Sequence, residues 1–131
     1  KSMKTQYHII VDTTDQHMAG TDSNIFIVLY GEHGTSDEIR INSIFKGNAF
    51  ERNHLDEGDF YVNEDYGDIH KIRVRSDGMY AGSEWLCSYI KIQRIKVDGE
   101  KVNGPVMKFS FGPNNWLKGG DEKIFTATSQ E

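Results

Sequence analysis

Hydrophobic and polar residues alternate with a period of two along most of the chain. Such alternation is typical of β-strands that turn one face to a core and the other to solvent. No segment has a convincing amphipathic helical pattern longer than two turns. In WLCSYIKIQRI, Ile90 and Ile92 are the pair expected to point into the core. The pattern predicts about eight strands, at residues 6–13, 24–32, 37–44, 59–64, 68–76, 85–95, 106–111 and 123–129.

Turn-forming residues separate these strands. Gly, Asn, Asp, Ser and Pro gather in GEHGTSD, NEDYGD, SDGMYAGS, VDGEKVNGP and GPNNWLKGGDE, and each of these residue types favours turns. Residues 98–104 predict a hairpin tip. Short strands joined by short loops indicate an antiparallel β-sandwich. A closed barrel is the alternative, which the unequal strand lengths disfavour.

Length and composition narrow the function classes. The 131 residues fit a single domain over 1–131, in which residues 1–5 are cloning residue or linker. A net charge of −5 argues against nucleic acid as a partner, and no apolar run approaches the ~18 residues that span a bilayer. No phosphate-cradling glycine loop or nucleophile elbow occurs, so neither nucleotide binding nor catalysis is predicted. Cys87 is the one cysteine, which leaves a cytoplasmic or extracellular compartment open.

Acidic residues and Asn gather in particular loops. If successive strands run antiparallel, the loops at 18–24 and 76–84 fall at the same end of a sandwich. Ca²⁺ binds six to eight oxygens of carboxylates, backbone carbonyls and waters. Gly20 allows a turn that points a carbonyl inward, and Asp22 and Asp77 then supply carboxylates. The alternative is plain turn formation, because Asp, Asn, Ser and Gly are the ordinary turn residues.

Several motifs together resemble those of one family. AGTDSNIFIVLYGEHGTSDEIRI resembles the opening of PLAT domains, the β-sandwich modules named after polycystin, lipoxygenase and clostridial α-toxin, with their A-G-T-(D/T) loop and L-(Y/F)-G-E-x-G strand end. AFERNHLDEGDFYV is similar to the family's F-E-R-G-x-x-D-x-F, and FGPNNWL to its closing aromatic, Asn and Trp-Leu. YGDIHKIRVRSDGMYAGSEWLCSYIKI is similar to its L-G-x-L-x-K-(I/L)-R-(I/V)-x-H-D-N-x-G-x-x-x-x-W. The resemblance covers roughly residues 6 to 118, in consistent order.

This resemblance implies an eight-stranded antiparallel β-sandwich of two four-stranded sheets. It also implies a non-catalytic module that docks a larger host protein onto membrane lipid or protein, often with Ca²⁺. The calcium ligands that it implies are Gly20, Thr21, Asp22, Asn48, Asp77 and the backbone carbonyl of Met79.

Departures from the family pattern each remove an oxygen donor. Met18 stands where some members have an acidic residue, Ala49 follows Asn48 in place of an Asp, and Ser76-Asp77-Gly78 replaces H-D-N. As a result, Met18, Met79 and Tyr80 occupy the expected tips of the calcium loops. Apolar tips beside a cation suit a peripheral membrane binder; the alternative is packing on neighbouring loops. Trp116, in a loop rich in Gly, Pro and Asn, is a further candidate for membrane or partner contact, with core packing as its alternative.

Three functions follow from these observations. The expected one is Ca²⁺-assisted lipid targeting at the end that carries Gly20, Asp22 and Asp77, with peripheral attachment to a membrane. The second is a protein-interaction or regulatory module that uses a sheet face or edge. The third is calcium-dependent carbohydrate binding on an exposed aromatic such as Trp116 or Tyr80. An enzyme ranks last.

Overall fold

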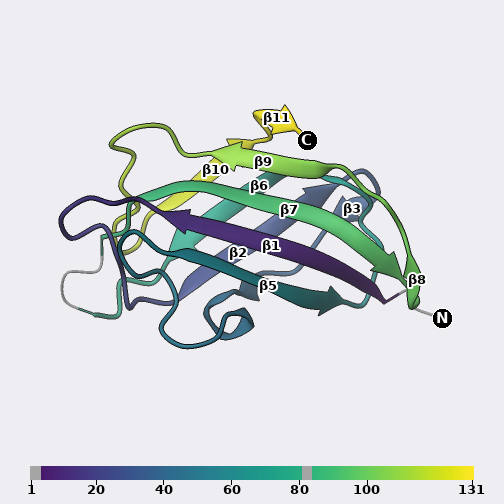
Figure 1. Cartoon of the computed structure of the whole chain (residues 1–131), viewed down its shortest axis with the longest axis horizontal. Helices are drawn as coiled ribbons and strands as arrows, with labels where there is room; N and C mark the ends of the chain where they lie inside the picture. Colours follow the sequence, from purple (N-terminus) through teal and green to yellow (C-terminus); the bar gives the residue numbers. More distant parts are fainter. Residues whose placement is uncertain (1–3, 81–83) are drawn as a thin grey trace.

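The computed structural model describes residues 4–80 and 84–131 and consists of two antiparallel β-sheets packed face to face (Figure 1). Sheet A contains β1 (Thr5–Thr13), β5 (Leu55–Val62), β7 (Cys87–Val97), β8 (Glu100–Lys101), β9 (Val106–Ser110) and β11 (Ser129–Gln130), in the order β11-β9-β7-β1-β5 with β8 paired to β7. Sheet B contains β2 (Ile25–Gly31), β3 (Gly34–Thr35), β4 (Ile39–Arg40), β6 (Ile69–Ser76) and β10 (Glu122–Thr126), in the order β10-β6-β2-β3 with β4 also paired to β2. The predicted antiparallel sandwich is confirmed.

The predicted strand count is matched in its main elements. β5, β1, β7 and β9 are the four principal strands of sheet A. Sheet B has β10, β6 and β2, and its fourth position is filled by β3 and β4, two short pieces that both pair with β2. The remaining pieces are the two-residue strands β8 and β11. Residues 1–3 of the expected terminal linker lie outside the described ranges, whereas Thr5 is buried and pairs with Val62 and Val97.

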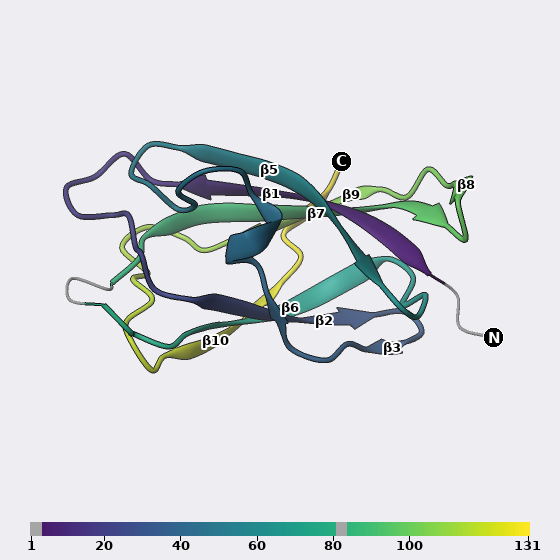
Figure 2. The same ribbon diagram turned by 90° about the horizontal axis from the view of Figure 1, so that it is seen from below.

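The core lies between the two sheets, which Figure 2 shows edge-on as two layers. Ile90 and Ile92 point into it, as the alternation predicts, and both are almost fully buried. The largest fully buried side chains include Trp85, Tyr7 and Phe50. Aromatic side chains bury large areas each, so a small set of them supplies much of the cohesion of a sandwich this size.

The strand predicted at 37–44 is wrong over most of its length. β4 covers two residues, and Asn42–Ile44 form a 3₁₀ helix. The reason is the Asn42 side chain, which accepts the N–H of Ile25 at 2.8 Å and donates to the carbonyl of Ser23 at 2.9 Å. An amide side chain that satisfies the first backbone groups of β2 replaces strand pairing there.

The same segment packs against the inner face of β5 at Gly58. β5 is the edge strand, and a Cβ at Gly58 would lie 2.9 Å from the carbonyl oxygen of Ile44. Glycine in the middle of a strand often marks such a close backbone approach.

The predicted hairpin tip at 98–104 is confirmed in its position. Val97 pairs with Glu100, and Asp98 and Gly99 between them have φ values of 49° and 81°. Positive φ at both central residues is the turn geometry that matches the twist of a two-residue hairpin. Among the described residues, no helix is long and apolar enough to cross a membrane.

Candidate functional site

Four connections meet at one end of the sandwich, which we call the loop end. They are residues 14–24, 46–54, 77–80 with 84–86, and 111–121, at the left of Figure 1. The strand register places them there, because β1 ends beside the start of β5 at Asp12 and Leu55, and β2 starts beside the end of β6 at Ile25 and Ser76. The strand pairing therefore brings the loop at 18–24 and the described part of the loop at 76–84 to one end, as predicted; residues 81–83 lie outside the described ranges.

Backbone contacts tie the first loop to its neighbours. Thr21 donates its N–H to the carbonyl of Phe50 at 3.0 Å, and Leu86 donates to the carbonyl of Ala19 at 2.9 Å. A Cβ at Gly20 would lie 2.9 Å from both the Phe50 carbonyl oxygen and the Arg52 amide nitrogen. Gly20 is thus required for close backbone packing between two loops.

Trp85 forms the floor under these loops. It is fully buried, its indole N–H donates to Thr13 Oγ1 at 2.9 Å, and its ring centroid lies 5.0 Å from that of Phe50 and 5.9 Å from that of Phe111. Its backbone exchanges two hydrogen bonds with Leu117. The Trp85 side chain therefore links the connection 84–86 to the end of β1, to the connection 46–54 through Phe50 and to the connection 111–121 through Phe111.

Asp77 and Asn24 clamp the two loops that carry the predicted carboxylates. Asp77 Oδ1 accepts the N–H groups of Asn24 and Met79, each at 3.1 Å, and Oδ2 accepts the Asn24 side-chain amide at 2.7 Å. A carboxylate offers about four lone-pair positions, so Oδ2 keeps one for a further ligand. In this arrangement Asp77 can bind a cation through one oxygen while it holds the loops together.

The clamp is fixed further by charge. Arg40 donates to Asn24 Oδ1 at 2.7 Å, which sets the orientation of the amide. Burial alone would raise the pKa of Asp77, but the hydrogen bonds from Asn24 and from the Met79 N–H outweigh it and hold that pKa below its usual range. The carboxylate is therefore ionised at neutral pH, as a cation ligand has to be.

The other predicted ligands differ in their surroundings. Asp22 is exposed, and its carboxylate makes no hydrogen bond or ion pair with the residues that the structure describes. Thr21 is buried and its hydroxyl accepts the N–H of Ser23 at 3.1 Å, a local turn bond. Asn48 is exposed, in the loop whose residue Phe50 contacts Thr21. Asp22 and Asp77 thus lie on clamped neighbouring loops, and Asn48 is brought near them only through its loop.

Sequence reasoning missed the role of Asn24. Its partner is 53 positions away, and only the register Ile25↔Ser76 brings the two together. Within the described part of the chain, no group of three or more His, Cys, Asp or Glu side chains is arranged to hold a metal ion. A cation at the loop end would therefore depend on the two carboxylates together with backbone and amide oxygens.

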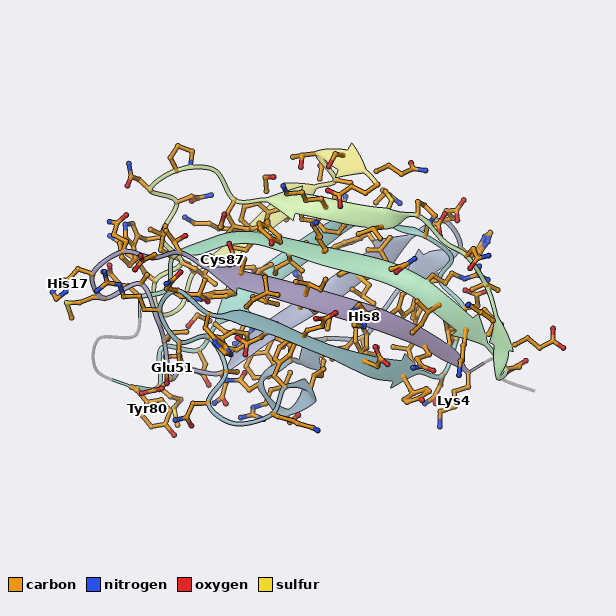
Figure 3. All side chains as sticks on the ribbon, viewed as in Figure 1. Lys4, His8, His17, Glu51, Tyr80 and Cys87 are labelled. Carbon is orange, nitrogen blue, oxygen red and sulfur yellow. The ribbon has the colours of Figure 1, made fainter. Side chains whose placement is uncertain are left out.

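The predicted contact residues are exposed to different extents. The exposed fractions of Met18, Met79 and Tyr80 are 63%, 68% and 55%, and Figure 3 shows Tyr80 projecting from the loop end, away from the sandwich. Met18 has a φ of 62°, which is an outlier for a bulky side chain. Trp116 is half-buried, and its carbonyl accepts the Lys123 ammonium at 2.9 Å.

Comparisons with known proteins agree with this architecture. The chain is 32% identical to human lipoxygenase homology domain-containing protein 1 over 85% of its own length, and it spans about 5% of the length of that relative. Among solved structures, a coral 8R-lipoxygenase superposes with a TM-score of 0.75 at 24% identity, covering 93% of this chain and 17% of the enzyme. The α-toxin of Clostridium absonum superposes with a TM-score of 0.63 at 25% identity, covering 98% of this chain and 32% of the toxin. The model of the PLAT/LH2 domain matches residues 7–126. With nearly its whole length matched and its sandwich shared, the chain belongs to the PLAT/LH2 domain family.

Proposed function

We propose that the chain is a non-catalytic targeting module whose loop end attaches to a phospholipid surface with the help of Ca²⁺. The observation that carries the proposal is the pairing, at one end of the sandwich, of exposed apolar tips with two carboxylates on clamped loops. Met18 is the sharpest instance, because a residue in left-handed backbone costs about 1–2 kcal/mol and here presents an apolar side chain to solvent. Strained backbone of this kind gathers at functional sites.

The charges suit a bridging cation. Asp22 has no internal partner among the described residues, and Asp77 keeps one lone pair on Oδ2. Ca²⁺ prefers such hard oxygens and takes the rest of its shell from carbonyls and water. A cation held there would offset the local negative charge and leave positions for lipid phosphate oxygens. The remaining predicted oxygens are those of Gly20, Thr21, Asn48 and Met79.

The apolar tips suit reversible attachment. Met18, Met79 and Tyr80 are each more than half exposed, and removing each from water would contribute roughly 1–2 kcal/mol. That sum supports peripheral binding only together with an electrostatic contribution. Related proteins give further support: the coral 8R-lipoxygenase is described as activated by calcium through a C2-like domain, and an 11R-lipoxygenase of the same fold as calcium-dependent.

Vesicle co-sedimentation tests the proposal. Phosphatidylserine-containing vesicles should pellet the chain in CaCl₂ and release it in chelator. Asp22→Asn should weaken the calcium-dependent fraction at least fivefold, because the change removes a ligand without breaking an internal hydrogen bond. Glu51→Gln is the matched control, since Glu51 is an exposed carboxylate at the same end (Figure 3) that is outside the predicted ligand set.

Two results would contradict the proposal. Sedimentation that is equal in calcium and chelator and unchanged in Asp22→Asn would remove the role of the cation. Absence of vesicle binding under all conditions would remove the role of lipid and favour a partner protein or a glycan as the target. Met18→Gln and Met79→Gln separate the two contributions, because they should lower the bound fraction and leave the calcium midpoint unchanged.

A further inference from the structure

A groove opens on the outer face of sheet A beside the loop end, away from the predicted calcium ligands. Its volume is about 410 Å³, within the range of small-molecule sites. Figure 1 shows the two loops that flank it, the one after β1 and the one after β9, on either side of the start of β7. The lining residues that matter are Thr14, Ser88, Tyr89, Lys108, Ser110 and Asn114.

Lys108 is the available cation of this groove. Its ammonium lies 4.8 Å from the centroid of the Tyr89 ring, and no carboxylate of the described residues lies within ion-pair distance of it. Lys91, opposite Lys108 in the β7–β9 ladder, also lies over Tyr89 but is paired with Glu131 at 2.8 Å. Lys91 is therefore held in an ion pair, whereas Lys108 has no ion-pair partner among the described residues and feels only the more distant charges of Asp12 and Glu131.

The lining adds hydrogen-bond donors. Thr14 and Ser88 offer hydroxyl groups that make no hydrogen bond within the described parts of the chain, whereas the Ser110 hydroxyl is shared with Thr128. Asp12, beside Tyr89 in the β1–β7 ladder, is the carboxylate against which an anion has to compete. Burial raises its pKa, and the charge of Lys108 lowers it in part.

We propose that the groove binds the phosphate group of a phospholipid headgroup, with Lys108 as the cation and the Thr14 and Ser88 hydroxyls as donors. A charge-assisted hydrogen bond to phosphate is the strong interaction that such a set can make. The choice of a lipid as the source of the phosphate rests on the proposed function. One wall of the groove, Thr14 and Gln16, belongs to the loop that carries Met18, so a module docked by that loop holds the groove at headgroup depth.

A titration in solution tests the groove separately from calcium. The labelled chain in chelator is titrated with dihexanoyl phosphatidylserine below its micelle concentration, and backbone amide shifts are followed by NMR. Saturable shifts should appear at Ser88, Tyr89, Lys108 and Ser110. Lys108→Gln should weaken binding at least fivefold, whereas Lys91→Gln, which has the same loss of charge on the facing strand, should change it less than twofold.

The possible results distinguish a failure of the lipid assignment, of the groove and of the proposed calcium role. Equal affinity for inorganic phosphate would overturn the lipid assignment, and shifts elsewhere, or equal effects of the two lysine variants, would overturn the groove itself. We expect Lys108→Gln to keep calcium-dependent vesicle binding, with reduced affinity and an unchanged calcium midpoint. If Asp22→Asn has no effect on vesicles while the headgroup still shifts the groove residues, the calcium role fails and the groove stands.

Discussion

Replacing Trp85 by Phe should loosen the floor of the loop end by a predictable amount. The change removes the 2.9 Å hydrogen bond to Thr13 Oγ1 and leaves that hydroxyl in a side chain that is 1% exposed. A buried hydroxyl without a hydrogen-bond partner costs about 1–3 kcal/mol, and the smaller ring leaves a cavity that costs roughly 1 kcal/mol more. We expect a loss of roughly 2–4 kcal/mol, which lowers the melting temperature by roughly 10 °C.

A double-mutant cycle isolates the hydrogen bond. Thr13→Val alone should destabilise the chain, because the buried indole N–H loses its acceptor. In the Trp85→Phe background, Thr13→Val removes the unpaired hydroxyl and should restore about 1 kcal/mol of the free energy of unfolding. Urea unfolding followed by far-UV circular dichroism gives each free energy of unfolding without relying on the indole as a probe. Equal costs of Thr13→Val in both backgrounds would refute the assignment.

Two further changes probe other parts of the structure. Both ring nitrogens of His8 face carboxylates, Glu57 at 2.6 Å and Asp59 at 2.5 Å. Both nitrogens must therefore donate a hydrogen bond, which only the imidazolium can do. Burial lowers the pKa of His8, but these two hydrogen bonds outweigh burial and raise that pKa above its usual value. The stabilisation is fully present below the unfolded pKa of about 6.5 and is lost as pH rises through the higher folded pKa. The urea midpoint of the native chain should therefore fall across that pH window, and the midpoint of His8→Gln should change less. Parallel curves for the two proteins would exclude the imidazolium. Gly78→Ala should destabilise the chain by more than the roughly 1–2 kcal/mol that a left-handed backbone costs an alanine. The φ of Gly78 is 64°, and the added Cβ would also lie 2.6 Å from the Gly119 Cα. A melting temperature within 2 °C of the native value, roughly the shift of a few tenths of a kcal/mol, would contradict this.

The alternation of apolar residues could predict the strands because burial of one face imposes it. It failed at 37–44, where Ile39 and Ile41 alternate well and Ile41 is indeed buried. A period of two reports which side chains are inside and does not report how the backbone is hydrogen-bonded. The outcome was decided by the side chain of Asn42, whose two bonds to the start of β2 replace strand pairing.

Strand boundaries failed for similar local reasons. β5 begins at Leu55, earlier than predicted, because it pairs with β1 from Asp12 onward although Leu55 itself is exposed. The last predicted strand divides into β10 and β11, which belong to different sheets. The change of sheet has no hydrophobic signature, since Ser129 and Gln130 of β11 are both polar and exposed.

The loop end was predictable to the level of which loops meet, and no further. Parity of antiparallel connections placed Asp22 and Asp77 at one end, and the structure adds that Asp77 is bonded to Asn24. That contact depends on the pairing of β2 with β6, which the sequence does not reveal. The groove at Lys108 could not be predicted either, because the sequence does not show that Glu131 pairs with Lys91 and leaves Lys108 without an ion-pair partner among the described residues.

Calcium binding at the loop end is tested most directly by calorimetry. CaCl₂ is titrated into the chelator-treated chain, its Asp22→Asn variant and the Glu51→Gln control. We expect saturable heat for the native chain and the control, with at least tenfold weaker binding in Asp22→Asn. No saturable heat in the native chain, or identical isotherms for all three proteins, would contradict a cation site formed by Asp22 and Asp77.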